Sequence, residues 1–524
     1  MDLATAKAAA HGGGGGAAEA VTVGRRRRGP IPTAASADAA SPAASAEAAA
    51  PPPGTGRPRA ALTEGPPARV LAASTAPLAL ALVALFGVQL AEAWLVGRIG
   101  PAALAGFGFV APVTMVVMSF GIGLGAGASA VVARALGAGD AGVARLAAHA
   151  LWLTLAMAAA LAVAGWFAAP AVLGWMSAGT DGDGPGAEAL AYLRVWMPGA
   201  LPLLVGMVAL SLARAAGDVR FQGAALAGAA LLAFALDWPL AFGVPGLWDG
   251  LGLAGVALAA GIAWSAMLAV ALWRLRRLGV LEAAPPLSAG AAEATRRVLR
   301  VGLPAAATNA IIPLASGVFT ALIAAHGGAS AVAGYALGTR TEALAMVAFF
   351  ALSAVMNPYA AQNAGAGRLD RVREGLRASF LFCAATGLAL AAAFWFAGPW
   401  IAAHLAPRDE AARASAALYF ALVPFGFGAV GAIAVANAAL NGLERPLAAV
   451  AVSAARTLLL GVPLAWLGGR LAGEAGTLAG IAVANLAAGL LAAWWSLRVA
   501  SPGVAPVAPL PGRALPSQTH PPGT

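Results

Sequence analysis

The sequence predicts an all-α membrane protein with twelve transmembrane helices arranged as two parallel six-helix repeats. Three observations predict this fold: an apolar composition, twelve hydrophobic stretches of bilayer length, and an internal repeat. The chain has 524 residues, of which 60% are hydrophobic and only 10% are charged, and its mean hydropathy is +0.80. Because a soluble chain carries about 25% charged residues, this composition excludes an ordinary soluble enzyme. The single cysteine, Cys383, excludes a disulfide framework.

The two ends of the chain are predicted to be disordered cytoplasmic tails. Residues 1–68 contain a glycine run, an arginine run and a long Ala/Pro/Ser-rich stretch. Few large apolar side chains are available there to offset the entropy cost of ordering the chain. The Pro-rich segment 499–524 has the same character.

Between the tails, hydrophobic stretches of about 20 residues, the length that crosses a bilayer, recur twelve times. Backbone groups in lipid must be satisfied within their own segment, so we expect helices. The approximate centres of the stretches are residues 85, 115, 158, 201, 232, 264, 312, 345, 390, 424, 458 and 486. The first six form an N-lobe at 69–274, a basic cytoplasmic linker occupies 275–300, and the last six form a C-lobe at 301–498.

Arginine distribution predicts how the helices cross the membrane. If the N-terminus is inside, fifteen arginines fall in the inner loops and five fall in the outer loops. The outer five are Arg98, Arg194, Arg408, Arg413 and Arg470. The positive-inside rule then places both termini in the cytoplasm. The net charge of +10 is explained by this orientation, so we expect no nucleic-acid partner.

The two halves of the sequence repeat one another at offsets between 224 and 228 residues. The matching segments are Gly137–Gly139 with Gly365–Gly367, Ala105–Phe107 with Ala333–Tyr335, Gly217–Arg220 with Gly442–Arg445, Pro239–Ala241 with Pro463–Ala465, and Leu253–Ala257 with Leu478–Ala482. Six spans are an even number, so both halves enter the membrane in the same direction. Transporters that rock two bundles about a central site are built in this way.

Several of these segments resemble the multidrug and toxic compound extrusion (MATE) family over about residues 70–498. The motifs that carry the resemblance are Val96–Gly100, Arg134–Asp140, Leu236–Leu240, Gly302–Pro304 and Gln362–Gly367. The resemblance implies an exporter of organic, often cationic compounds that is driven by inward flow of H⁺ or Na⁺. It implies no cofactor other than this coupling ion.

Charges inside membrane spans are costly and usually functional, and two acidic ones lie in the N-lobe. Glu92 lies near the outer end of the first span and Asp237 near the outer end of the fifth, so we expect them at a similar depth. Gln89 lies one turn before Glu92 on the same helix face. Two carboxylates in a low-dielectric cavity favour the binding of a cation, either H⁺ or Na⁺. No counterparts occur in the C-lobe, where the offset leads to Thr320 and Gly461.

The family's usual pattern carries an Asp at the position of Glu92 and another at that of Asp237. This sequence departs from the pattern in two ways: a glutamate replaces the first aspartate, and Ala233 occupies a position where many members have Asn. The missing amide removes a ligand for Na⁺ and favours H⁺ as the coupling ion.

The C-lobe carries a different polar set near the predicted midplane. Its members are Asn309, Arg340, Glu342 and Arg456. Glu342 is expected to pair with Arg456, because residues two apart on a helix, such as Arg340 and Glu342, do not share a face. The pair is either a structural link between helices or a second substrate or proton site. Met346, Phe349 and Trp264 either line an aromatic pocket for flat cations or occupy core positions.

We therefore expect a cation-coupled antiporter that exports organic drugs by alternating access, as a monomer in the inner (plasma) membrane. One alternative is a flippase for lipid-linked oligosaccharides from the same superfamily, for which only Arg340 and Arg456 would meet a pyrophosphate. A second alternative is a membrane enzyme or scaffold without transport activity. It would need a nucleophile, metal or phosphate site, and the sequence shows none.

Overall fold

The computed structural model describes residues 60–176, 184–285, 288 and 290–501. Most of the two predicted tails, 1–68 and 499–524, lies outside these residues, namely 1–59 and 502–524. The first half of the described chain contains η1 (Ala61–Thr63), α1 (Pro67–Ile99), α2 (Pro101–Gly137), α3 (Val143–Trp175), α4 (Pro185–Ala215), α5 (Val219–Phe242), β1 (Gly243–Val244), β2 (Trp248–Asp249) and α6 (Leu253–Arg277). The antiparallel β1–β2 hairpin, which the sequence did not predict, links α5 to α6.

The second half consists of helices alone. They are α7 (Ala291–Ala345), α8 (Val347–Gly365), α9 (Leu369–Leu405), α10 (Glu410–Leu422), η2 (Val423–Gly426), α11 (Phe427–Gly442), α12 (Pro446–Ala454), η3 (Ala455–Gly461) and α13 (Val462–Val499). The predicted linker 275–300 is shorter in the structure, because α6 extends to Arg277 and α7 begins at Ala291.

The described residues contain twelve membrane crossings, as predicted. Ten segments are long and apolar enough to span a bilayer, and two of them, 291–345 and 446–499, have 55 and 54 residues. Each of these two segments contains one break at which the chain turns back, so each crosses the membrane twice. In α7 the break is at Gly328, whose φ of 71° suits glycine. In α13 it is at Ala472 and Gly473.

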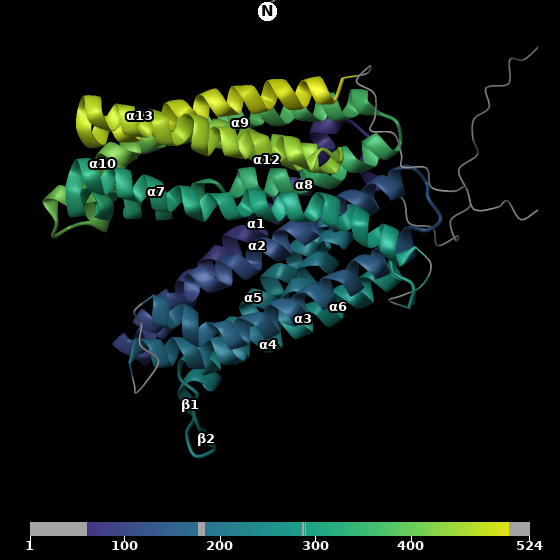
Figure 1. Cartoon of the computed structure of the whole chain (residues 1–524), viewed down its shortest axis with the longest axis horizontal. Coiled ribbons are helices and arrows are strands. Elements are labelled where there is room, and N and C mark those ends of the chain that lie inside the picture. Colours follow the sequence, from purple (N-terminus) through teal and green to yellow (C-terminus); the bar gives the residue numbers. More distant parts are fainter. Residues whose placement is uncertain (1–59, 177–183, 286–287, 289, 502–524) are drawn as a thin grey trace, which may run out of the picture. The chain divides into compact units, whose positions relative to one another are not determined.

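Helices α1–α6 form one bundle and α7–α13 form the other (Figure 1). Small residues allow the helices within a bundle to approach closely. In the first bundle Gly199 of α4 faces Gly261 of α6, and in the second Gly387 of α9 faces Gly428 of α11. Large apolar side chains such as Phe167, which is 77% exposed, cover the outside. This surface suits a lipid environment.

The two bundles touch at the end of the molecule where α2, α4, α6 and α8 finish, which we call the linker end. Here Gly127 of α2 lies against the backbone of Val298 and Gly302 of α7. Close by, Gly137 of α2 packs against Gln362 of α8. Because glycines remove the side chains at these points, the two bundles meet backbone to backbone.

Residues 60–68 belong to the predicted disordered tail, yet they are ordered at the linker end. The backbone N–H of Leu62 in η1 donates to Gln362 Oε1 at 2.9 Å, and Leu62 itself is buried. Arg368 donates to the Thr63 carbonyl at 3.0 Å, and Arg371 donates to the Gly65 carbonyl at 2.7 Å. Polar side chains of α8 and α9 therefore supply hydrogen bonds that compensate for the ordering of this segment.

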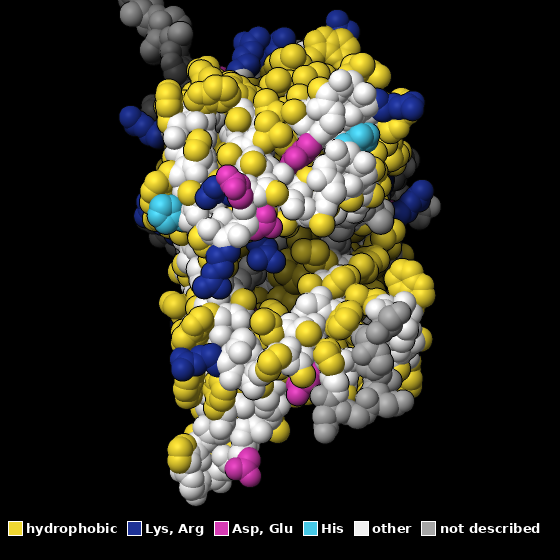
Figure 2. Space-filling model, turned by 90° about the vertical axis from the view of Figure 1, so that its left-hand side faces the viewer, with side chains coloured by type: hydrophobic (Ala, Val, Ile, Leu, Met, Phe, Trp, Pro, Cys, Tyr) yellow, Lys and Arg dark blue, Asp and Glu magenta, His cyan; other side chains and the backbone are white. Residues whose placement is uncertain are grey.

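The opposite end carries the β1–β2 hairpin, and we call it the hairpin end. Figure 2 views the molecule from this end and shows a recess between the two bundles in which apolar side chains are visible. The molecule is thus closed at the linker end and hollowed at the hairpin end.

Candidate functional site

The N-lobe acidic pair comes from two neighbouring helices of the first bundle. Helices α1 and α5 pack together where Gly223 of α5 meets the Pro77 carbonyl and the Ala81 methyl group of α1. Asp237 of α5 is buried, with 2% of its surface exposed, and Glu92 of α1 is half-buried. The two carboxylates lie within electrostatic range of one another. The structure therefore brings together the two residues that the sequence singled out.

Neither Glu92 nor Asp237 forms an ion pair or a hydrogen bond with another described residue. Tyr192 of α4, which is 4% exposed, lies within electrostatic range of both carboxylates. Its ring packs edge-on against Phe107 of α2, with 5.8 Å between ring centres. Sequence reasoning missed Tyr192, although a tyrosine inside an apolar span is a signal, since a buried hydroxyl usually has a polar neighbour.

Gln89 lies on α1 one turn before Glu92, as predicted, but its side chain is exposed, unlike those of the acidic pair. Ala233, where many family members have Asn, lies one turn before Asp237 on α5 and is half-buried. The cluster therefore consists of Asp237 and Tyr192, which are buried, and the half-buried Glu92.

The C-lobe polar set forms a second cluster, with a different pairing from the predicted one. Tyr419 of α10 donates its hydroxyl to Glu342 of α7, and Arg456 Nε donates to Asn485 Oδ1 of α13 at 2.8 Å. Glu342 and Arg456 act on each other electrostatically, but no ion pair within 4.0 Å joins them in the described chain. Tyr335 completes the cluster, 5.7 Å from the ring of Tyr419.

Arg456 occupies η3, a short π-helical segment between α12 and α13. Such segments are rare and often occur at functional sites. Sequence reasoning missed Tyr335, Tyr419 and Asn485. The signal for Asn485 was an amide inside an apolar span, since a polar group in lipid needs a partner on another helix.

The remaining predicted cavity residues are scattered. Arg340 is exposed, and Asn309 donates to the Ala305 carbonyl of its own helix at 2.8 Å. Met346 and Phe349 are 1% and 0% exposed, which favours core positions, the second of the two alternatives, over an aromatic pocket.

Phe349 packs against Gly431, and its ring centre lies 6.3 Å from that of Phe382. Trp264 is half-buried against Trp196 of α4, with 5.9 Å between ring centres. These aromatic side chains therefore pack inside the bundles.

A family model described as MatE matches residues 77–238 and 304–467, one segment in each bundle. The chain belongs to the MatE family. The first matched segment contains the Glu92–Asp237 pair, and the second contains Glu342 and Arg456. Members of this family are transporters, so this chain is a multi-pass membrane transporter of the efflux type.

Individual relatives agree over most of the chain. A protein of Shewanella oneidensis named as an FAD transporter is 31% identical over 449 residues, covering 85% of this chain and 97% of its own. A probable multidrug resistance protein NorM of Pseudomonas syringae pv. tomato is 27% identical, covering 77% of this chain and 85% of its own. The same description applies to a Pseudomonas aeruginosa protein that is 30% identical, covering 75% and 80%.

Solved MATE structures share the fold. The Vibrio cholerae MATE transporter VcmN in the bent form superposes with a TM-score of 0.77 at 25% identity, covering 83% of this chain and 97% of VcmN. A transporter from Pyrococcus furiosus gives a TM-score of 0.77 at 21% identity, covering 84% and 98%. These similarities confirm the predicted architecture of two six-helix repeats.

Proposed function

We propose that this MATE transporter is an antiporter in which a cation bound at Glu92 and Asp237 drives the export of organic compounds. The observation that carries the proposal is the burial of Asp237 beside Glu92, without an ion-pair or hydrogen-bond partner for either among the described residues. A buried, unpaired carboxylate is costly in its charged form. Binding of a cation relieves that cost, and the cluster is therefore suited to taking up and releasing one.

H⁺ is the favoured coupling ion. A Na⁺ site needs several oxygen ligands, and the position one turn before Asp237 is Ala233, which offers none. Two carboxylates and one hydroxyl are sufficient to hold a proton.

The closed linker end and the recess at the hairpin end support alternating access. Basic side chains such as Arg145, Arg274 and Arg277 gather at the linker end, and the positive-inside rule puts such an end in the cytoplasm of a bacterial inner membrane. The structure then corresponds to an outward-open monomer. Cation binding from outside would favour the release of substrate, and by reciprocity the substrate would weaken cation binding.

The substrates we propose are organic, often cationic compounds, the class that the family resemblance implies and that fits the two NorM relatives. A flavin nucleotide is the second candidate, because the relative that is 31% identical is named as an FAD transporter. The exposed guanidinium of Arg340 suits a phosphate-bearing substrate better than a cation. A lipid-linked oligosaccharide would also carry phosphates and is the third candidate substrate.

The test is transport in proteoliposomes that hold a pH gradient or a Na⁺ gradient, with ethidium or FAD as substrate. We expect ethidium transport driven by the pH gradient to fall at least tenfold in Glu92→Gln and Asp237→Asn, because each removes half of the coupling site. Glu293→Gln is the matched control, since Glu293 is an exposed carboxylate that pairs with Arg297 at 2.8 Å.

The outcomes separate the candidates. Undiminished pH-driven transport in both site variants would refute the coupling site. Transport of FAD without ethidium would assign the flavin nucleotide, and transport of neither by the wild-type protein would favour a flippase, which is then tested with a fluorescent lipid-linked sugar.

A further inference from the structure

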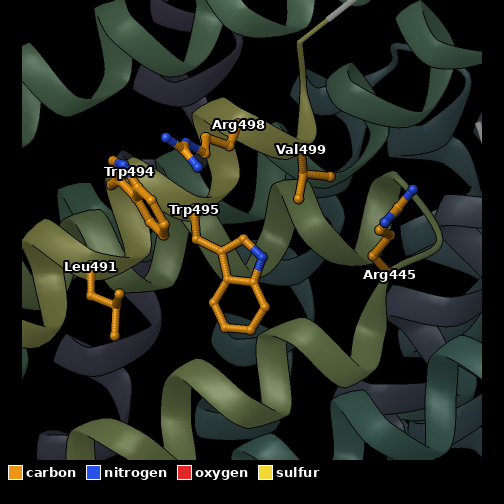
Figure 3. Close-up of a pocket in the computed structure, with 6 residues that line it drawn as sticks. All are labelled: Arg445, Leu491, Trp494, Trp495, Arg498 and Val499. Atoms are coloured by element: carbon orange, nitrogen blue, oxygen red, sulfur yellow. The ribbon is translucent and has the colours of Figure 1, made fainter. Parts of the chain in front are cut away.

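A pocket of about 500 Å³ opens at the linker end of the second bundle, away from both polar clusters. The residues that line it are Arg445, Leu491, Trp494, Trp495, Arg498 and Val499. Figure 3 shows the Trp495 indole among these residues, with Arg498 above it and Arg445 to its right. None of the lining residues is acidic. The volume lies within the usual range of small-molecule sites, roughly 300–1,000 Å³.

The floor of the pocket is apolar and well packed. Trp495 and Val499 pack against a buried cluster that includes Leu440 of α11, Val452 of α12 and Ala492 of α13. One residue on the rim is held in place, because the Arg498 guanidinium lies 4.5 Å above the ring of Trp494. A stacked guanidinium keeps its N–H groups directed outward for an anion.

The pocket borders the lipid-facing surface of the bundle. Leu447, Leu458, Leu459 and Leu490 on the same helices are between 63% and 75% exposed, as expected of side chains in contact with acyl chains. Trp494 and Arg498 lie in the last two turns of α13. Tryptophan and arginine at a helix end mark the boundary between the acyl chains and the headgroups of a bilayer.

The first bundle has the same Arg–Trp motif, but a different residue follows the tryptophan. Trp273 and Arg277 end α6 with the same spacing as Trp494 and Arg498 end α13, and their rings and cations also stack, at 5.3 Å. In α6 the residue after Trp273 is Arg274, which pairs with Asp218 at 2.7 Å. In the second bundle the corresponding residue is Trp495, which lines the pocket and packs against the apolar cluster below it.

We propose that this pocket binds the headgroup of an anionic phospholipid, with the phosphate between Arg445 and Arg498 and the glycerol region against Trp495. Basic pockets between helices at a membrane surface recognise such headgroups. Glu444, which precedes Arg445 in the sequence, pairs with Arg134 of the first bundle at 3.7 Å, and Arg498 stacks on Trp494. The exposed leucines then provide the path for the acyl chains.

The experiment measures lipid retained by the purified protein in native mass spectrometry, with dioleoyl phosphatidylglycerol or dioleoyl phosphatidylcholine added. We expect Arg498→Gln to lower the affinity for phosphatidylglycerol about fivefold. The double variant Arg445→Gln with Arg498→Gln should lower it about 25-fold, because each arginine contributes a similar factor. Phosphatidylcholine binding should not change. Arg277→Gln is the matched control, because it removes the cation of the equivalent Arg–Trp pair without touching the pocket.

Two further measurements keep the result decisive. The double variant Arg445→Lys with Arg498→Lys keeps both positive charges and should retain most of the phosphatidylglycerol binding. This result would show that the double Gln variant loses binding through the loss of charge and not through misfolding. Equal loss in Arg277→Gln, or no loss in the double Gln variant, would overturn the proposal. Displacement of the lipid by millimolar inorganic phosphate would overturn the assignment to a lipid and indicate a site for a free phosphate.

Discussion

The side-chain amide of Gln362 on α8 donates to the backbone carbonyl of Ala215 at the end of α4, with 2.6 Å between Nε2 and O. Its oxygen accepts from the N–H of Leu62 at 2.9 Å. One buried amide thus joins the second bundle, the first bundle and η1. Gln362 and Asn363 belong to the motif that carried the family resemblance, and both take part in closing the linker end, since Asn363 donates to the Leu62 carbonyl.

We expect Gln362→Ala to make the linker end open more often, because it leaves the Ala215 carbonyl and the Leu62 N–H without their partner. A lost buried hydrogen bond costs about 1–3 kcal/mol, which corresponds to at least a fivefold change in population. The readout is the labelling rate by N-ethylmaleimide of Ala306→Cys in a Cys383→Ala background, since Ala306 is buried against Gly123 across the interface.

The control for this prediction is Gln222→Ala. Gln222 is buried and accepts from Arg214 at 2.9 Å, within the first bundle. Its loss should lower stability without changing the labelling of residue 306. Similar labelling in both variants would contradict a specific role for Gln362.

Gly127→Ala should prevent the linker end from closing. A Cβ atom at residue 127 would lie 2.6 Å from the Val298 carbonyl oxygen and 2.8 Å from the Gly302 nitrogen, and backbone atoms cannot move aside as a flexible side chain would. We expect fast labelling of residue 306 and loss of pH-driven transport. Gly108→Ala on the same helix is the control, because a Cβ there meets nothing within 4 Å. Normal transport by Gly127→Ala would refute the close approach.

Tyr419→Phe should destabilise the second bundle without abolishing coupling. The substitution removes the hydroxyl that donates to Glu342, and a hydrogen bond to a charged group contributes about 1.5–3 kcal/mol. We expect a lower free energy of unfolding in micelles and transport that keeps its dependence on the pH gradient. Tyr359→Phe is the comparison, since Tyr359 donates to the Arg371 carbonyl at 2.8 Å. Loss of coupling in Tyr419→Phe alone would favour a second proton site at Glu342.

Phe349→Ala should lower the free energy of unfolding by about 3–5 kcal/mol, the usual cost of emptying a buried aromatic position. Phe349 is completely buried, whereas its neighbour Phe350 is 41% exposed. Phe350→Ala should therefore cost far less. Chemical unfolding in micelles measures both, and substrate preference should be the same in the two variants. A changed substrate preference with little loss of stability in Phe349→Ala would indicate that Phe349 lines the substrate cavity.

Much of the architecture could be predicted from the sequence, because the requirements of the membrane apply to each hydrophobic segment separately. A helix in lipid satisfies its own backbone and needs about 20 apolar residues, so the twelve spans and the repeat were readable. Glu92 and Asp237 stood out because charge in such a segment is costly. Their depth followed from counting along two helices that run in the same direction.

Contacts between segments were decided only by the tertiary structure. Helix rotation is set by packing against neighbours, and the sequence does not give it. The sequence therefore left Phe349 either in an aromatic pocket or in the core, and in the structure it packs against Gly431. The partner of Glu342 proved to be Tyr419, since a residue on a third helix lay nearer than Arg456. Likewise, residues 60–68 were predicted to be disordered because the tail has few large apolar side chains, whereas α8 and α9 provide hydrogen bonds that order them. The sequence by itself determined where the chain crosses lipid, and the fold decided which side chains meet.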